Sequence, residues 1–83
     1  IQSKLNRIYG ELKFFENELL ASYDPQKLPE YMERLAEMER KALALKIPKR
    51  AASDFYTLRT SIDYVRNALN RGDHLALGSD NQA

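Results

Sequence analysis

Apolar residues recur along this chain at alternating steps of three and four residues, in three separate stretches. This spacing places each set on one narrow stripe of an α-helix. A repeat of this kind is typical of coiled-coil-like helices that bury one face against their neighbours, so the sequence predicts three amphipathic helices. The stripes are Ile1, Leu5, Ile8, Leu12, Phe15 and Leu19; Leu28, Tyr31, Leu35, Met38, Ala42 and Leu45; and Ala51, Phe55, Leu58, Ile62, Val65 and Leu69.

Proline interrupts the pattern for the first time after residue 22. Asp24 and Pro25 together favour a turn followed by a new helix start. Because proline is best tolerated in the first turn of a helix, Pro29 argues against a regular helix that begins at Pro25. We therefore expect an irregular turn, with the second helix regular from about Leu28.

The second interruption is Ile47-Pro48, since the residue before a proline is pushed out of helical geometry. Pro48 can then open the third helix, and Gly72 is expected to close it as a C-terminal cap. The expected helices cover about residues 1–22, 28–46 and 49–71. Short connections between them favour an antiparallel, up-down-up arrangement.

The predicted fold class is all-α, with a three-helix bundle over residues 1–72 and a flexible tail over residues 73–83. Gly10 lies inside the first helix, where glycine is unfavourable, and we attribute it to the close approach of a neighbouring helix rather than to a hinge. The chain starts at Ile1 in heptad register and without an initiator methionine. We expect it to be a piece of a longer protein.

Composition narrows the function classes. The 83 residues include 13 basic and 12 acidic ones, mixed along the whole chain, so we expect no nucleic-acid footprint. The nearest candidate, Lys46, Lys49 and Arg50, is interpreted as a solvated helix junction. With no cysteine and a single histidine, His74, we expect no catalytic residue, metal site or cofactor. No apolar run approaches the roughly 20 residues that span a bilayer.

Charged residues beside the stripes predict contacts between the first and third helices, which run parallel in this arrangement. Glu11 and Glu18 precede residues of the first stripe by one position. Arg59 and Arg66 follow residues of the third stripe by one position, which is the complementary edge of a parallel pair. We therefore predict an ion pair between Glu11 and Arg59. The same match pairs Glu18 with Arg66, and both pairs would chiefly set register and bundle handedness.

Three large apolar side chains, Phe14, Leu43 and Tyr64, fall outside the stripes. Singly exposed apolar residues are common on soluble proteins, but a fold that gathered these three would present a partner surface. The sequence leaves both possibilities open, and self-association is one form that such a contact would take.

The stretch Leu58-Arg59-Thr60-Ser61-Ile62-Asp63 resembles the start of the all-helical chorismate mutases. In that family, arginines and a lysine hold the two carboxylates of the substrate inside a helical bundle. The stretch opens the chain in those enzymes, whereas here it lies in the last helix. We therefore favour a structural role for Arg59 and Asp63 and expect no enzymatic activity.

A second resemblance covers most of the chain. Its motifs are Arg7-Ile8-Tyr9-Gly10-Glu11-Leu12-Lys13, Asp24-Pro25, Ile47-Pro48 and Tyr56-x-Leu58-Arg59-x-x-Ile62-Asp63-x-Val65-Arg66-x-x-Leu69. In this order and spacing they resemble the C-terminal region of a subset of TAXI-family TRAP transporter solute-binding subunits. The chain departs from that pattern at Pro29 and at Ser61.

This resemblance implies an exported ligand-binding domain, then a membrane-spanning helix, then the present helices on the cytoplasmic side of the bacterial inner membrane. Solute-binding residues would lie in the upstream domain, so none is assigned here. Lys4 and Arg7 fit the positive-inside tendency of such segments. The membrane would be reached only through the upstream segment.

The function expected from the resemblance is a non-catalytic helical interaction or anchoring module. Its partners would be proteins: a second copy of the chain, or the membrane subunits of the transporter. The alternative is a generic coiled-coil assembly or adaptor domain with no link to transport. The two hypotheses share every internal feature and differ in what precedes Ile1.

Overall fold

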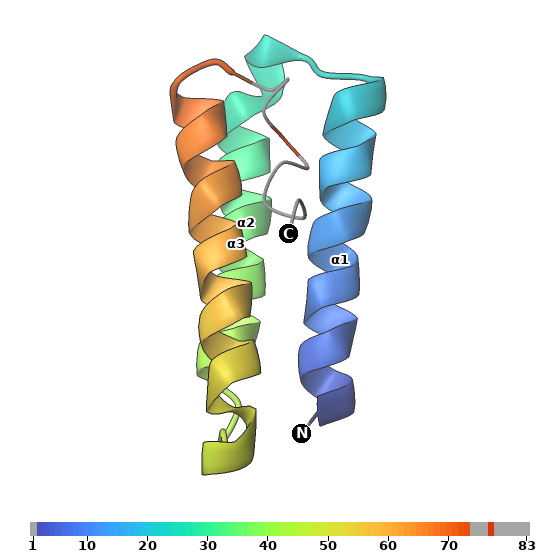
Figure 1. The fold of residues 1–83 in the computed structure, drawn as a ribbon. Coiled ribbons are helices and arrows are strands. Elements are labelled where there is room, and N and C mark those ends of the chain that lie inside the picture. The colour runs from blue at the N-terminus through green and yellow to red at the C-terminus, as the bar shows by residue number, and fades with distance from the viewer. Residues whose placement is uncertain (1, 74–76, 78–83) are drawn as a thin grey trace.

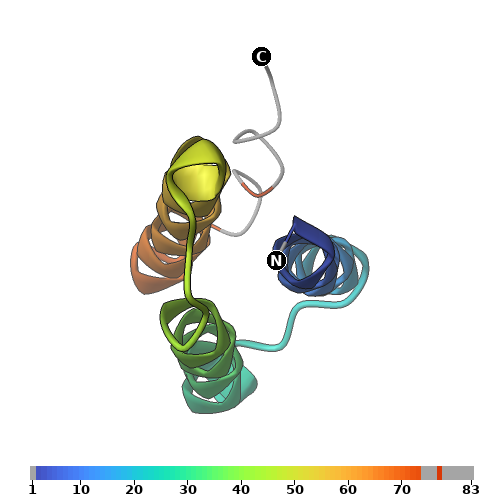
Figure 2. The same cartoon turned by 90° about the horizontal axis from the view of Figure 1, so that it is seen from below.

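The computed structural model describes residues 2–73 and residue 77. It contains the helices α1 (Gln2–Ala21), α2 (Leu28–Leu43) and α3 (Ala52–Asn70), with the short 3-10 helices η1 (Pro25–Lys27) and η2 (Lys49–Ala51) in the connections. The three long helices run up, down and up (Figure 1). Viewed along their axes they occupy the corners of a triangle (Figure 2). The all-α three-helix bundle expected from the stripes is confirmed.

The core consists mainly of the predicted stripes, to which the structure adds Ala68 and Leu77. In each of the three helices, stripe residues are excluded from solvent, and Leu28, Leu45 and Phe55 at the ends are half-buried and pack against the others. Burial of a Leu, Ile or Phe side chain contributes about 1.5–3 kcal/mol, so this seam is the main source of stability. The described stripe residues that are buried are Leu5, Ile8, Leu12, Phe15, Leu19, Tyr31, Leu35, Met38, Ala42, Ala51, Leu58, Ile62, Val65 and Leu69.

Tyr31 ties the first connection to the core. Its ring meets Phe15 edge to face, with centroids 5.9 Å apart, and stacks on Tyr23 at 5.7 Å. Its hydroxyl accepts a hydrogen bond from the backbone N–H of Asp24 at 3.1 Å. A buried tyrosine usually finds such a partner for its polar end, and here the bond fixes the point where the chain turns back.

The turn before α2 follows the expectation drawn from its prolines. The side chain of Asp24 accepts a hydrogen bond from the N–H of Gln26 at 3.0 Å, and Pro25 opens η1. Regular α-helix begins at Leu28, which leaves Pro29 in the first turn, where a missing N–H is tolerated.

The break around Pro48 is wider than predicted. The second helix ends at Leu43 rather than at residue 46, and the third becomes α-helical at Ala52 rather than at residue 49. The last turn of α2 tightens, with the N–H of Leu45 bound to the carbonyl of Ala42 at 3.2 Å. Because Pro48 is extended, at φ −70° and ψ 159°, the residues before it leave helical geometry early and a 3-10 turn follows it.

Gly72 closes α3 as predicted. Its φ of +71° lies in the left-handed region, which glycine adopts without a steric penalty. The N–H of Gly72 binds the carbonyl of Leu69 at 3.0 Å, and the N–H of Asp73 binds that of Ala68 at 2.9 Å. These two bonds form a Schellman motif, which satisfies carbonyls that the end of the helix leaves free.

Gly10 contradicts the explanation proposed for it. It is exposed, and a Cβ built on it meets no atom within 4 Å, so no neighbouring helix approaches it closely. We expect Gly10→Ala to raise the free energy of unfolding by about 0.5–1 kcal/mol, because alanine loses less backbone entropy in a helix and nothing obstructs its methyl group. Urea denaturation measures this change.

Gly72→Ala is the matched control for that substitution. Because its backbone is left-handed, the same added methyl group should lower the free energy of unfolding by about 1–2 kcal/mol. Opposite signs at the two glycines would show that conformation, not composition, decides the effect. A loss of stability at Gly10 would contradict the exposed position described for it.

The flexible tail predicted over residues 73–83 lies, except for Asp73 and Leu77, outside the described residues. Leu77 is buried, at 5% exposure, and belongs to the core. The heptad pattern did not reveal this contact, because Leu77 follows the helix stop at Gly72.

Candidate interaction surfaces

The two predicted ion pairs between α1 and α3 are wrong. Glu11 binds Lys41 of α2, with Oε1 3.1 Å from Nζ. Glu18 accepts two hydrogen bonds from Arg34 of α2, at 2.9 and 3.1 Å. The acidic edge of α1 is therefore paired along α2.

The arginines of α3 also turn to α2. The carboxylate of Glu39 accepts a hydrogen bond from Nη2 of Arg66 at 2.9 Å and another from Nη2 of Arg59 at 3.4 Å. Arg66 holds Asp63 of its own helix as well, at 2.7 Å. Glu39 is therefore the carboxylate that Arg59 and Arg66 share, and the Nε of Arg59 is buried without a hydrogen-bond partner.

The correction follows from the order of the helices around the bundle. In an antiparallel pair, residues that precede one stripe face residues that precede the other, and residues that follow face residues that follow. Glu18 and Arg34 each precede a stripe residue, whereas Glu39 and Arg66 each follow one. The predicted pairs require the opposite handedness, in which the Glu18 edge would face α3; in the structure it faces α2.

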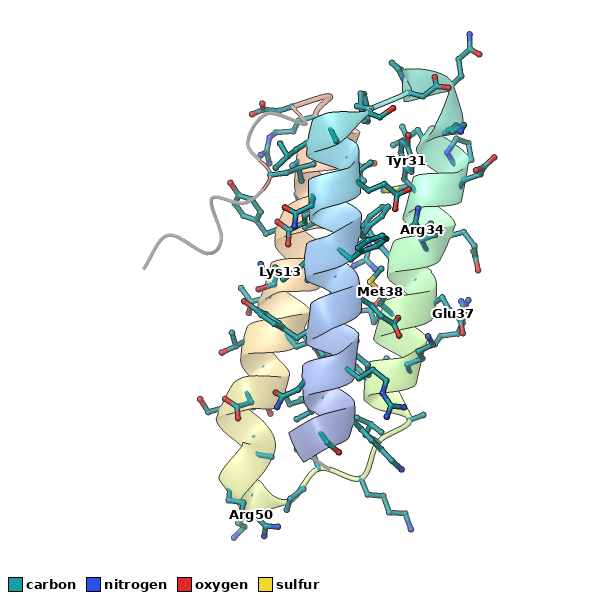
Figure 3. All side chains as sticks on the ribbon, turned by 90° about the vertical axis from the view of Figure 1, so that its right-hand side faces the viewer. Lys13, Tyr31, Arg34, Glu37, Met38 and Arg50 are labelled. Atoms are coloured by element: carbon teal, nitrogen blue, oxygen red, sulfur yellow. The ribbon has the colours of Figure 1, made fainter. Side chains whose placement is uncertain are left out.

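Arg34 of α2 contacts two residues of α1: the exposed Glu18, which it binds by hydrogen bonds, and the buried Phe15. Its guanidinium lies 4.5 Å from the ring centroid of Phe15, and in Figure 3 its side chain extends from α2 toward α1. The hydrogen bond from Arg34 lowers the pKa of Glu18 below its ordinary 4.5, and the bond to Glu18 raises the pKa of Arg34. A carboxyl with a lowered pKa stabilises the fold above pH about 4.5, and this contribution is lost as the pH falls through the lowered value.

The outer face of α2 has its own ion pairs. Arg40 binds Glu33 at 2.7 Å and also pairs with Glu37, and the hydrogen bond to Arg40 lowers the pKa of Glu37. Figure 3 shows Glu37 directed away from the bundle. These contacts are those of a solvated helix face.

Glu16 is a buried charged residue that the sequence analysis missed. It is 2% exposed, and its Oε2 lies 3.0 Å from Nζ of Lys13. Lys13 in turn lies 4.9 Å from the ring centroid of Tyr9. The sequence feature that could have indicated its burial is its position directly after the stripe residue Phe15. This position lies on the edge of α1 opposite to Glu18, and because the Glu18 edge faces α2, the opposite edge faces α3. The buried Ser61 of α3 occupies the corresponding edge of that helix.

Arg59 and Asp63 of the mutase-like stretch lie at the edge of the core and form ion pairs there. Arg59 binds Glu39 and lies 6.0 Å from the ring of Phe55, while Asp63 binds Arg66. Leu58 and Ile62 of the same stretch are core residues. The structural role favoured for Arg59 and Asp63 accounts for their contacts.

The three apolar residues proposed as a partner surface lie on three different helices. Phe14 of α1 is 69% exposed and Leu43, the last residue of α2, is 54% exposed. Tyr64 is half-buried and borders a shallow hollow of α3. Neither Phe14 nor Leu43 lines this hollow. The hollow beside Tyr64 is lined by hydroxyl-bearing residues alone: Ser53, Tyr56, Thr57, Thr60, Ser61 and Tyr64.

One end of the bundle collects basic residues that are distant in the sequence. The start of α1 lies at the same end of the bundle as the connection from α2 to α3 (Figure 1), and Arg50 marks this end in Figure 3. Lys4 and Arg7 line a groove together with Ala44 and Leu45. We call this region the basic end and define it by five exposed residues: Lys4, Arg7, Lys46, Lys49 and Arg50.

Neither family models, nor curated proteins, nor solved structures match this chain. Within residues 2–73 and 77, no three His, Cys, Asp or Glu side chains are grouped so that they could hold a metal ion. None of the described helices has the length and apolarity needed to cross a bilayer.

Proposed function

We propose that this chain is a non-catalytic helical module for interaction and anchoring. The observation that carries the proposal is the contrast between its interior and its surface. The three stripes bury one another, and the charged edges of α1 and α3 are paired along α2. Several large apolar side chains are exposed rather than buried in the core, and the cations of the basic end take no part in these ion pairs. Among the described residues, the exposed large apolar ones are Phe14, Leu20, Leu43 and Tyr56.

In its specific form, the proposal is that the module is the cytoplasmic C-terminal appendage of a TAXI-family TRAP transporter solute-binding subunit. Its support is the resemblance of the motifs in α1 and α3. Several motif residues have structural roles here: Glu11 pairs with Lys41, and Arg66 with Glu39. Arg7 and Gly10 of the same motif are exposed, so they are accessible to a partner.

The DNA sequence upstream of the codon for Ile1 tests the transporter proposal. We expect an export signal, a large two-lobed binding domain and about 20 apolar residues that end just before Ile1. A start codon a few residues upstream, or an unrelated upstream domain, would contradict it. The generic assembly domain would then be the better hypothesis.

Self-assembly is the second candidate, and the 69% exposure of Phe14 favours it, because a phenylalanine left in water gains from burial in a partner. Light scattering across a concentration series distinguishes a monomer from a self-associating bundle. If Phe14 forms the contact, Phe14→Ser abolishes a concentration-dependent rise in mass, whereas a rise that persists in this variant assigns the contact to another surface.

A further inference from the structure

The fold separates charges that are mixed in the sequence. The basic end contains five basic residues, and Asp54 lies beside it in the first turn of α3. Glu11 lines the groove with Lys4 and Arg7, but it is paired with Lys41, and this pair adds no net charge. This gives the region a formal charge of +4, whereas the rest of the chain has eight basic and eleven acidic residues, or −3. The net charge of +1 therefore conceals a molecule with a positive end.

The cations of the basic end are available to an external partner. In the part of the chain that the structure describes, Lys46, Lys49 and Arg50 make no ion pair, nor do Lys4 and Arg7, and all five are exposed. The cations along α2 and α3 differ in this respect. Arg34, Lys41 and Arg66 are each within 3.1 Å of a carboxylate oxygen. An unpaired cation retains its attraction for a distant negative surface, because no neighbouring carboxylate neutralises it.

Exposed apolar groups accompany these cations. Leu43 ends α2 three residues before Lys46, and Tyr56 lies in the second turn of α3, close to η2; they are 54% and 64% exposed. Ile8 and Leu45 contribute apolar surface to the groove that Lys4 and Arg7 line. Basic residues together with Leu and an aromatic residue are the combination that binds the headgroup region of a bilayer, where tyrosine is also enriched.

We infer that the basic end docks on the surface of an anionic phospholipid bilayer. The five cations come from α1 and from the connection between α2 and α3 rather than from one helix face. They therefore do not form the single basic helix that enters a nucleic-acid groove, whereas an anionic lipid surface attracts cations from several segments at once. The inference extends the proposed anchoring role by adding a direct membrane contact to the contact through an upstream segment. It needs neither a transporter nor an upstream helix.

Vesicle cosedimentation with the 83-residue chain tests the inference. We expect binding to equimolar phosphatidylcholine–phosphatidylglycerol vesicles at low salt, weaker binding at high salt, and little binding to pure phosphatidylcholine vesicles. Each cation near an anionic surface changes the partition constant roughly fivefold, so Lys49→Gln/Arg50→Gln should reduce it about 25-fold.

The matched control is Lys27→Gln/Arg71→Gln, which removes the same charge from two exposed residues at the opposite end of the bundle. It should bind vesicles nearly as well as the wild-type chain. An equal loss in both double variants would overturn the inference, because net charge alone would then explain binding. Equal binding to neutral vesicles would also overturn it, as would binding to duplex DNA in the absence of vesicle binding.

The outcome is separable from that of the proposed function. Vesicle binding that fails while the upstream gene encodes a binding domain and a spanning helix would remove the membrane contact and leave the transporter proposal intact. If the chain binds vesicles and the upstream sequence is unrelated to a transporter subunit, the membrane contact is supported and the transporter proposal is contradicted.

Discussion

Phe15→Ala should lower the free energy of unfolding by about 3–5 kcal/mol, the range measured when a large buried aromatic side chain is truncated. Phe15 is fully buried, meets Tyr31 edge to face and lies under the guanidinium of Arg34. Its removal therefore opens a cavity in the α1–α2 contact and withdraws the surface on which Arg34 rests. Urea denaturation followed by circular dichroism measures the loss.

Phe14→Ala is the control for that experiment, since Phe14 is adjacent in sequence and 69% exposed. It should change the free energy of unfolding by less than about 0.5 kcal/mol, as surface substitutions usually do. A small domain has only about 5–15 kcal/mol of stability, so Phe15→Ala could unfold it, and Phe15→Leu provides a smaller step at the same site. Equal effects at Phe14 and Phe15 would show that the helix is rotated relative to the structure.

Glu39→Gln should lower the free energy of unfolding by about 1–2 kcal/mol. Hydrogen bonds to charged groups contribute about 1.5–3 kcal/mol, and the partial exposure of this site reduces that figure. Without the carboxylate, Arg59 loses its ion pair with Glu39, and its buried Nε already has no partner, while Arg66 retains only its pair with Asp63. Thermal unfolding at low and high salt measures the loss, which should shrink as salt screens the two cations.

Glu33→Gln is the matched control, because it makes the same change on the same helix at a side chain that is 70% exposed and binds one arginine of its own helix. Its effect should be much smaller. A double-mutant cycle between Glu39 and Arg66 should show coupling, whereas a cycle between Glu18 and Arg66 should show none. If only the cycle between Glu18 and Arg66 shows coupling, the ion pair predicted from the sequence is correct and the pairing described for the structure is wrong.

The helices themselves follow from local rules. Each stripe has the spacing of a buried helix face, and side chains such as Leu12, Leu35 and Ile62 are fully buried. The turn at Asp24-Pro25 and the cap at Gly72 depend on the backbone preferences of those residues, so short segments suffice to predict them. The early end of α2 was missed, because the effect of Pro48 extends over more than the one residue before it.

The handedness of the bundle could not be read from the stripes. The edge that contains Glu18 is acidic, and both Arg34 of α2 and Arg66 of α3 complement it in charge. The two arrangements therefore satisfy the same heptad pattern, and the choice depends on the packing of all three helices together. The burial of Glu16 has the same origin, since the edge on which it lies faces α3 in one arrangement and α2 in the other.

The basic end was missed for a different reason. Its residues come from two segments separated by about 40 positions, and each segment taken alone resembles a solvated helix end. A count of charges over each segment of the sequence includes acidic residues that lie elsewhere in the folded molecule, so the basic residues do not stand out. Only the antiparallel return of α2 brings Leu45, the residue before Lys46, into one groove with Lys4.

The arrangement on which this account depends can be tested with pairs of introduced cysteines, because the chain has none of its own. In dilute protein, Glu18→Cys/Arg34→Cys should be joined within one molecule by a short bifunctional maleimide, and Glu18→Cys/Arg66→Cys should not. Mass spectrometry of the digested monomer identifies the linked peptides. A link between positions 18 and 66, without one between 18 and 34, would contradict the order of the helices described here.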